Sequence, residues 1–247
     1  MIKVIHTHIK KTTAAIALLS AEVIIVLLLF FSSFFLFLVI ADTIFLQGKD
    51  VFDNMIFDYL NRHVSNLNNS VMQFFTFMGT SNFMLPANIV LFTYFAYIKP
   101  HRWYSIKIPV ISLTSLVVMV TLKQIFNRPR PLTPLLHAAE GLSFPSGHAL
   151  TSTTFYGLLI YIVWERVKDH KQKWFLVAAL IFLILIIGFS RIYLRVHYAS
   201  DVMAGYCLGL IWLVISLWVL RHLERFTHKK IDPVVEEEKT VAQSISI

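Results

Sequence analysis

The sequence predicts an all-α polytopic membrane protein with six transmembrane helices and a short interfacial amphipathic helix after the first span. Composition is the first reason: 57% of the 247 residues are hydrophobic and only 15% are charged. A soluble domain of this length could not bury so much apolar side chain away from water. The second reason is that these residues gather in long runs of about 18 residues or more, enough to cross a hydrocarbon core of roughly 30 Å.

Six such runs define the predicted spans. They cover approximately residues 14–40, 74–98, 106–122, 148–164, 174–189 and 202–220. The fourth and fifth runs are short and end among polar residues. The first run exceeds the roughly 7 to 15 apolar residues of a secretory signal, and no good cleavage site follows it. We therefore expect it to remain as a membrane helix.

The interfacial helix is predicted in LQGKDVFDNMIFDYLNRHVSNLNN, residues 46–69. Apolar residues recur there at helical spacing among polar ones. They are Val51, Met55, Ile56, Tyr59 and Leu60. This pattern favours an amphipathic helix lying on the membrane surface.

The basic residues predict the orientation. With six spans, 15 of the 22 lysines and arginines lie on the side of the two termini, which the positive-inside rule assigns to the cytoplasm. Topology thus accounts for most of the net charge of +8, and no nucleic-acid partner is expected. Residues 1–230 are predicted to form a single integral membrane domain. Residues 231–247 read as a disordered cytoplasmic tail.

Five basic residues gather on the opposite side, at the outer ends of the third and fifth spans. They are Lys123, Arg128, Arg130, Arg191 and Arg195. Cations near membrane-helix ends mark a function or reach to the interface, and interfacial anchoring would explain a single arginine. Five together, on the same side as a histidine at the start of the fourth span, indicate a site for an anion.

Three motifs contain these residues: KQIFNRPRP at 123–131, PSGH at 145–148 and SRIYLRVHYASD at 190–201. Their spacing resembles the three motifs of the type 2 phosphatidic acid phosphatase superfamily. Together with FFTFMGTSNFMLP at 74–86, they resemble its bacterial membrane branch, which includes phosphatidylglycerophosphate phosphatase B and undecaprenyl pyrophosphate phosphatases. The resemblance implies a multi-pass plasma-membrane enzyme that acts on lipid phosphates at the extracytoplasmic surface.

The residue types suit phosphoryl transfer, which needs fixed positive charge around the phosphoryl oxygens. Lys123, Arg130 and Arg191 would supply that charge, with Arg130 chosen over Arg128 by its six-residue spacing from Lys123. Ser146 and Gly147 would let the backbone at the start of the fourth helix approach the phosphate closely.

Two histidines and one aspartate would carry the catalysis. His197 and Asp201 are four residues apart, so on a helix Asp201 could hold the imidazole in one tautomer. The resemblance implies that His197 attacks phosphorus to form a phosphohistidine. His148 would protonate the leaving group and later activate water. No metal ligand set and no cofactor are expected.

Some alternatives stay open. Arg128 and Arg195 could meet a second phosphate or a lipid headgroup, or simply anchor at the interface. A transporter or flippase for anionic lipids would use charges spread through the depth of the spans, whereas these lie at one level. A catalytically silent lipid-binding protein would not need the complete set of nucleophile, acid and orienting carboxylate.

Overall fold

The computed structural model describes residues 2–136 and 140–231, and every regular element in that part is a helix. In chain order the helices are α1 (Ile2–Ala41), α2 (Val51–Asn61), α3 (Asn66–Phe77), α4 (Ser81–Thr93), α5 (Arg102–Phe126), α6 (Gly147–Arg166), α7 (His170–Tyr193) and α8 (Ala199–Phe226). π-Helical turns extend α1, α4 and α8 over Asp42–Leu46, Tyr94–Ile98 and Thr227–Ile231. The predicted disordered tail lies, apart from Ile231, outside the described residues.

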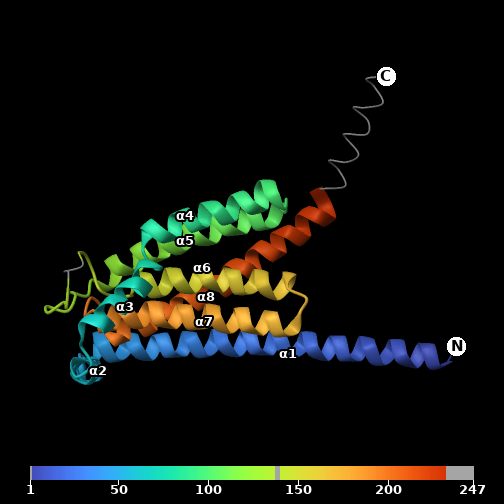
Figure 1. The fold of residues 1–247 in the computed structure, drawn as a ribbon. Helices are drawn as coiled ribbons and strands as arrows, with labels where there is room; N and C mark the ends of the chain where they lie inside the picture. The colour runs from blue at the N-terminus through green and yellow to red at the C-terminus, as the bar shows by residue number, and fades with distance from the viewer. Residues whose placement is uncertain (1, 137–139, 232–247) are drawn as a thin grey trace.

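The helix α6 lies at the centre of a bundle of long helices and packs against α5, α7 and α8 (Figure 1). α1 lies along α8, and α4 packs on α5. The short helices α2 and α3 gather at the end of the bundle opposite the N-terminus, where they contact α7 and α8. This end also holds the α5–α6 loop.

Five helices are long and apolar enough to cross a membrane. These candidate spans are Glu22–Leu46, Ser81–Ile98, Arg102–Phe126, His170–Tyr193 and Ala199–Lys229. The fourth predicted span corresponds to α6, which does not reach the same hydropathy. α6 carries buried Ser152, Thr153 and Thr154 and is covered by three helices, so protein rather than lipid surrounds its polar groups.

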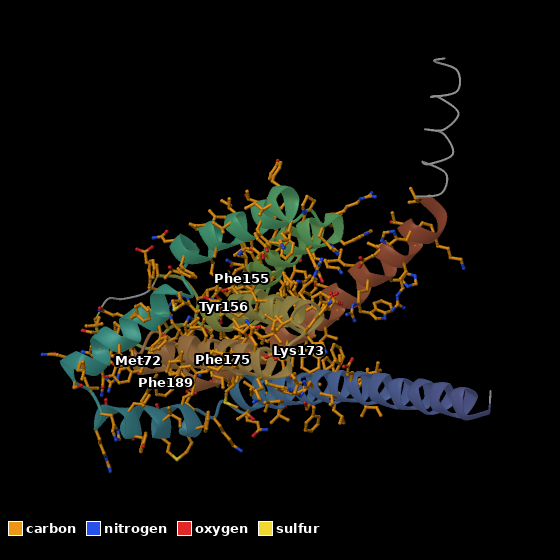
Figure 2. The ribbon with its side chains drawn as sticks, turned by 45° about the vertical axis from the view of Figure 1, so that its right-hand side comes forward. Met72, Phe155, Tyr156, Lys173, Phe175 and Phe189 are labelled. Carbon is orange, nitrogen blue, oxygen red and sulfur yellow. The ribbon has the colours of Figure 1, made fainter. Side chains whose placement is uncertain are left out.

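The second predicted span, residues 74–98, is wrong as a single helix. α3 ends at Phe77, and α4 begins at Ser81 after the N-cap Thr80, whose backbone is extended. Gly79 in this turn lies against other helices: a Cβ there would sit 2.6 Å from Cγ2 of Ile187 and 2.8 Å from Cδ2 of His148. The hydroxyl of Tyr156, at the bundle centre in Figure 2, donates to the Met78 carbonyl at 2.9 Å.

The predicted interfacial helix is present as α2. Its face toward the protein buries Leu60 and the carboxylate of Asp53, whereas Val51, Met55 and Tyr59 are exposed. The predicted apolar residues are therefore divided: Leu60 and Ile56 pack on the bundle, whereas Val51, Met55 and Tyr59 point away from it.

Close packing of α6 on α8 brings two of the sequence motifs together. A Cβ at Gly205 would lie 2.7 Å from the carbonyl oxygen of Ser146, so only glycine permits this approach. At the contact, the backbone N–H of Ser146 donates to the carbonyl of Asp201 at 2.9 Å. The start of α6 is thereby fixed against the start of α8.

Candidate active site

The three motifs meet at the end of the bundle opposite the N-terminus (Figure 1). α5 ends at Asn127, whose φ of 46° is left-handed and turns the chain into the loop 127–146. That loop leads back to Ser146, the N-cap of α6. The turn between α7 and α8 lies beside it, because Arg130 donates to the Val196 carbonyl at 2.7 Å.

His197 lies at the centre of this arrangement and is 2% exposed. Its Nε2 is 3.1 Å from Nη1 of Arg130, and its Nδ1 is 3.3 Å from Oγ of Ser143. Because a guanidinium can only donate, Nε2 acts as the acceptor and the ring proton sits on Nδ1. The lone pair is then on the nitrogen expected to attack phosphorus.

Burial lowers the pKa of His197 to about 4, because the imidazolium would lose its hydration. The carboxylate of Asp201 acts in the opposite direction, while Arg130 and Lys123 lower the pKa further. His197 is therefore uncharged at neutral pH, as a nucleophile must be.

Asp201 is completely buried and faces His197, but not as a helical neighbour. α8 begins at Ala199, so His197 precedes it, and the predicted shared helix face is wrong. The carboxylate instead folds back over the N-terminus of α8, where Oδ2 accepts from the N–H of Tyr198 at 2.9 Å. Oδ2 lies 3.5 Å from Nδ1 of His197, longer than a normal hydrogen bond.

The three predicted phosphate-binding cations surround this pair without carboxylate partners within salt-bridge distance. Lys123 donates to the Leu142 carbonyl, and Arg191 donates to Thr76 Oγ1 at 2.8 Å. Nε of Arg130 donates to two loop carbonyls, at 3.0 and 3.1 Å. Burial lowers the pKa of Arg130, while Asp201 raises it. Nε of Arg191 is buried without any hydrogen-bond partner.

His148 occupies the first turn of α6, where Nε2 is likewise buried without a partner. Its ring lies beside Gly79, in the turn between α3 and α4. The positive charges that act on His148 are those of Arg191, Arg130 and Lys123. The predicted acid and the predicted cations thus share one site.

Ser146 and Gly147 form the start of α6, as predicted. Oγ of Ser146 accepts from the N–H of Ala149 at 3.5 Å, and the N–H of Ser146 donates to the backbone carbonyl of Asp201. At Gly147, a Cβ would make only ordinary contact with Met119, at 3.5 Å or more. Packing alone therefore does not require glycine here, whereas the approach of a ligand to the backbone would.

Two site residues escaped the sequence interpretation. Ser143 is fully buried and its hydroxyl donates to Oδ2 of Asp201, beside Nδ1 of His197. Arg128 donates to Asp201 Oδ1 at 2.7 Å and to Asp53 Oδ2 at 2.9 Å. Arg128 is therefore a buried ion-pair partner, not an interfacial anchor. Its position beside a second Arg-Pro pair was the sequence signal. Ser143 had no sequence signal beyond its closeness to PSGH.

Comparison with known proteins identifies the family of this chain. Residues 105–225 match the model of the PAP2 superfamily. Over 166 residues, 65% of this chain and 79% of the relative, the sequence is 30% identical to phosphatidylglycerophosphatase B of Bacillus subtilis. This chain belongs to the PAP2 superfamily. The resemblance predicted from the three motifs is confirmed.

A solved PAP2 relative also shares the fold. The chain matches the crystal structure of a transmembrane PAP2 type phosphatidylglycerolphosphate phosphatase from Bacillus subtilis with a TM-score of 0.71 and 28% identity, covering 80% of this chain and 98% of that one. It is also 27% identical to an undecaprenyl-diphosphatase of Sulfolobus acidocaldarius over 187 residues, 70% of this chain and 82% of that protein. With its apolar helices, the chain is a multi-pass membrane member of the PAP2 superfamily.

Proposed function

We propose that this protein hydrolyses phosphate monoester or pyrophosphate groups of membrane lipids through a phosphohistidine on His197, without a metal. The named relatives act on phosphatidylglycerophosphate and on undecaprenyl diphosphate. Those lipids and phosphatidate are the substrate types that we propose for this chain.

One observation carries the proposal: buried nitrogen atoms around His197 lack partners. Nε of Arg191 and Nε2 of His148 make no hydrogen bond, and Lys123 reaches only a backbone carbonyl. A buried unpaired donor costs about 1–3 kcal/mol, and more if charged, so such groups need a function. A phosphate bound here would supply acceptors for all of them.

In the first chemical step, Nε2 of His197 forms a bond to phosphorus while the bond from phosphorus to the leaving oxygen breaks. His148 gives that oxygen its proton. Arg130 releases Nε2 as it turns its donors toward the phosphoryl oxygens, where charge develops in the transition state. Asp201 stays beside Nδ1–H and stabilises the positive charge that forms on the ring.

In the second step, His148 takes a proton from water as the water oxygen attacks phosphorus. The nitrogen–phosphorus bond breaks, and inorganic phosphate leaves. His197 returns to its starting form. These steps need no co-reactant other than water.

For the membrane arrangement, we propose that α6 also crosses the bilayer, which brings the number of spans to six. Its 20 residues give a length of about 30 Å, and neighbouring helices shield it from lipid. Both termini then face the cytoplasm, and the site opens at the extracytoplasmic surface of the plasma membrane. Residues 1–230 act as one domain.

The function is tested by phosphate release from purified protein in detergent, with a panel of lipid phosphates and diphosphates. We expect release from at least one lipid, unchanged by EDTA. Loss of activity that Mg²⁺ restores would overturn the metal-free mechanism. Wild-type protein that binds these lipids and releases no phosphate from any of them would overturn the proposed reaction.

The orientation needs its own test. A cysteine placed at the partly exposed Leu136, in the site loop, should react with a membrane-impermeant thiol reagent in intact cells. Labelling only after permeabilisation would reverse the orientation. The native Cys207 is buried, so an otherwise unchanged chain provides the background.

A further inference from the structure

Arg128 makes four side-chain hydrogen bonds at the site end of the bundle, all of them to side chains. Nη1 donates to Oγ of Ser200 at 2.8 Å and to Oδ1 of Asp201 at 2.7 Å. Nη2 donates to Asp53 at 2.9 Å and to the more exposed Asp50 at 3.1 Å. The guanidinium also lies 4.0 Å from the centroid of the Tyr198 ring. Its two terminal nitrogens are thus committed to carboxylates and a hydroxyl of the protein itself.

These contacts give Arg128 a different place from the phosphate-binding cations. Burial lowers the pKa of Arg128, but Asp201 and Asp53 outweigh that effect and raise it overall. With two buried carboxylates already beside it, the guanidinium has little positive charge to offer a phosphate. A second phosphate at Arg128 would have to displace Asp201 from its partner.

The same contacts fix the carboxylate of Asp201 from two sides. Arg128 lies on the Oδ1 side. Asp53 ties Arg128 to Ser200, because it accepts from Arg128 Nη2 and from Ser200 N and Oγ, the last two at 2.9 and 2.6 Å. Oδ2 is thereby left for Ser143 and Nδ1 of His197. A single rotation of the Asp201 side chain would break both sets of contacts.

We propose that Arg128 is a positioning residue, which holds Asp201 in the orientation that serves His197 and uses Asp53 of α2 as its second anchor. The inference rests on the proposed function, because it assigns Arg128 a part in that reaction. It also gives α2 a role, because this helix carries the carboxylate that holds Arg128 in place.

A charge so close to Asp201 also affects the pH dependence of the reaction. Removing the positive charge of Arg128 favours protonation of His197 and of Asp201, so activity should be lost at higher pH as the solution is acidified. Removing the negative charge of Asp53 has the opposite effect. The other titratable or charged groups around His197 and Asp201 are Asp50 on α2, Lys123 on α5, Arg130 in the α5–α6 loop, His148 on α6, Arg191 on α7 and Tyr198 before α8.

The test compares Arg128→Gln, Arg128→Lys and Asp53→Asn with the wild type, using phosphate release from a lipid phosphate in detergent between pH 4 and pH 9. A misplaced catalytic group can cost about 100-fold in rate, so we expect kcat of Arg128→Gln to fall to that extent with KM little changed. The acidic limb of its kcat/KM profile should move to higher pH. Arg128→Lys should recover part of kcat and most of the wild-type profile, and Asp53→Asn should move the limb to lower pH or leave it in place.

Lys107→Met is the matched control, because it breaks a buried ion pair with Glu224 at the other end of the bundle. It should leave the pH profile unchanged even if the protein becomes less stable. Arg128→Gln with a wild-type profile, or with a limb that moves together with that of Asp53→Asn, would overturn the positioning role. If Arg128→Gln does not fold, Arg128→Lys and Asp53→Asn still decide the matter by their profiles. Wild-type protein without phosphatase activity would instead count against the proposed function.

Discussion

The two ends of the helical bundle treat their charges in different ways. At the end near the N-terminus, buried Lys107 pairs with Glu224 at 2.8 Å and also donates to the hydroxyl of Tyr161 at 3.2 Å. Arg221 pairs with Glu165 at 2.8 Å, and Glu165 accepts from Tyr104. These pairs join α5, α6 and α8 through opposite charges.

At the other end, positive charge exceeds negative charge. Within the described residues, Arg128 at this end pairs with carboxylates, whereas Lys123, Arg130 and Arg191 reach carbonyls and a hydroxyl. Repulsion among buried cations costs stability, and folding alone gives no reason to retain them. The paired charges hold helices together, while the unpaired ones are the groups that we propose bind an anion.

The largest expected effect comes from removing the nucleophile. His197→Ala should lose turnover by about 10⁴-fold or more, because the remaining cations can bind phosphate but cannot accept it. His148→Ala should lose about 10²–10⁴-fold with a lipid substrate, since the leaving oxygen is no longer protonated. An aryl phosphate, whose leaving group needs no proton, should restore the first step in His148→Ala only. Asp201→Asn should fall between the two variants.

The two histidine variants test the roles assigned to His197 and His148 independently of the family membership. Rescue of His197→Ala by the aryl substrate would exchange the assignments of the histidines. An equal loss of aryl and lipid reactions in His148→Ala would mean that its contribution is not proton transfer.

The second prediction contrasts one cation from each end. Arg191→Met should lower kcat/KM by about 10²–10³-fold, as removal of a transition-state donor does, with thermal stability unchanged or raised. Lys107→Met should keep its activity but lose about 1.5–3 kcal/mol of stability, because Glu224 loses a charged hydrogen bond. Assays and thermal unfolding in the same detergent check both, and the reverse pattern would break the comparison.

The third prediction concerns pH and is smaller. Since the pKa of His197 is lowered to about 4, the acidic limb of kcat/KM that arises from protonation of His197 should appear only near that value. An unfolded histidine titrates near 6.5. The contribution of His197 to stability is therefore complete above pH 6.5 and is progressively lost between pH 6.5 and about 4. An acidic limb of kcat/KM at pH 6.5 that persists with every substrate, whatever the pKa of its phosphate, would contradict the buried, neutral His197.

Most of the helices, and most of the residues that meet in the candidate site, could be predicted because both leave local patterns in the sequence. Long apolar runs mark helices that face lipid. Lys123, Arg130, His148 and His197 belong to motifs whose spacing can be read from the sequence. The break between α3 and α4 has a local signal in Gly79 and the N-cap Thr80, whereas the close approach of Gly79 to His148 and Ile187 on other helices is visible only in three dimensions.

Long-range pairing also hid the role of Arg128. Its carboxylate partners Asp53 and Asp201 lie far from it along the chain in both directions, and only the packing of α2 on α8 brings them together. The surroundings of α6 were likewise hidden in the sequence. Its Ser and Thr content lowers its hydropathy, and its burial among neighbouring helices is visible only in three dimensions.

Trapping the covalent intermediate tests the central claim most directly. Purified protein is mixed with a lipid phosphate labelled with ³²P, quenched in base, which preserves phosphohistidine, and separated from the lipid. Wild-type protein should carry label that is lost in acid, His197→Ala should carry none, and Lys107→Met should be labelled like the wild type. Label that persists in His197→Ala would contradict the account. Wild-type protein that turns over the substrate but carries no covalent label would contradict it as well.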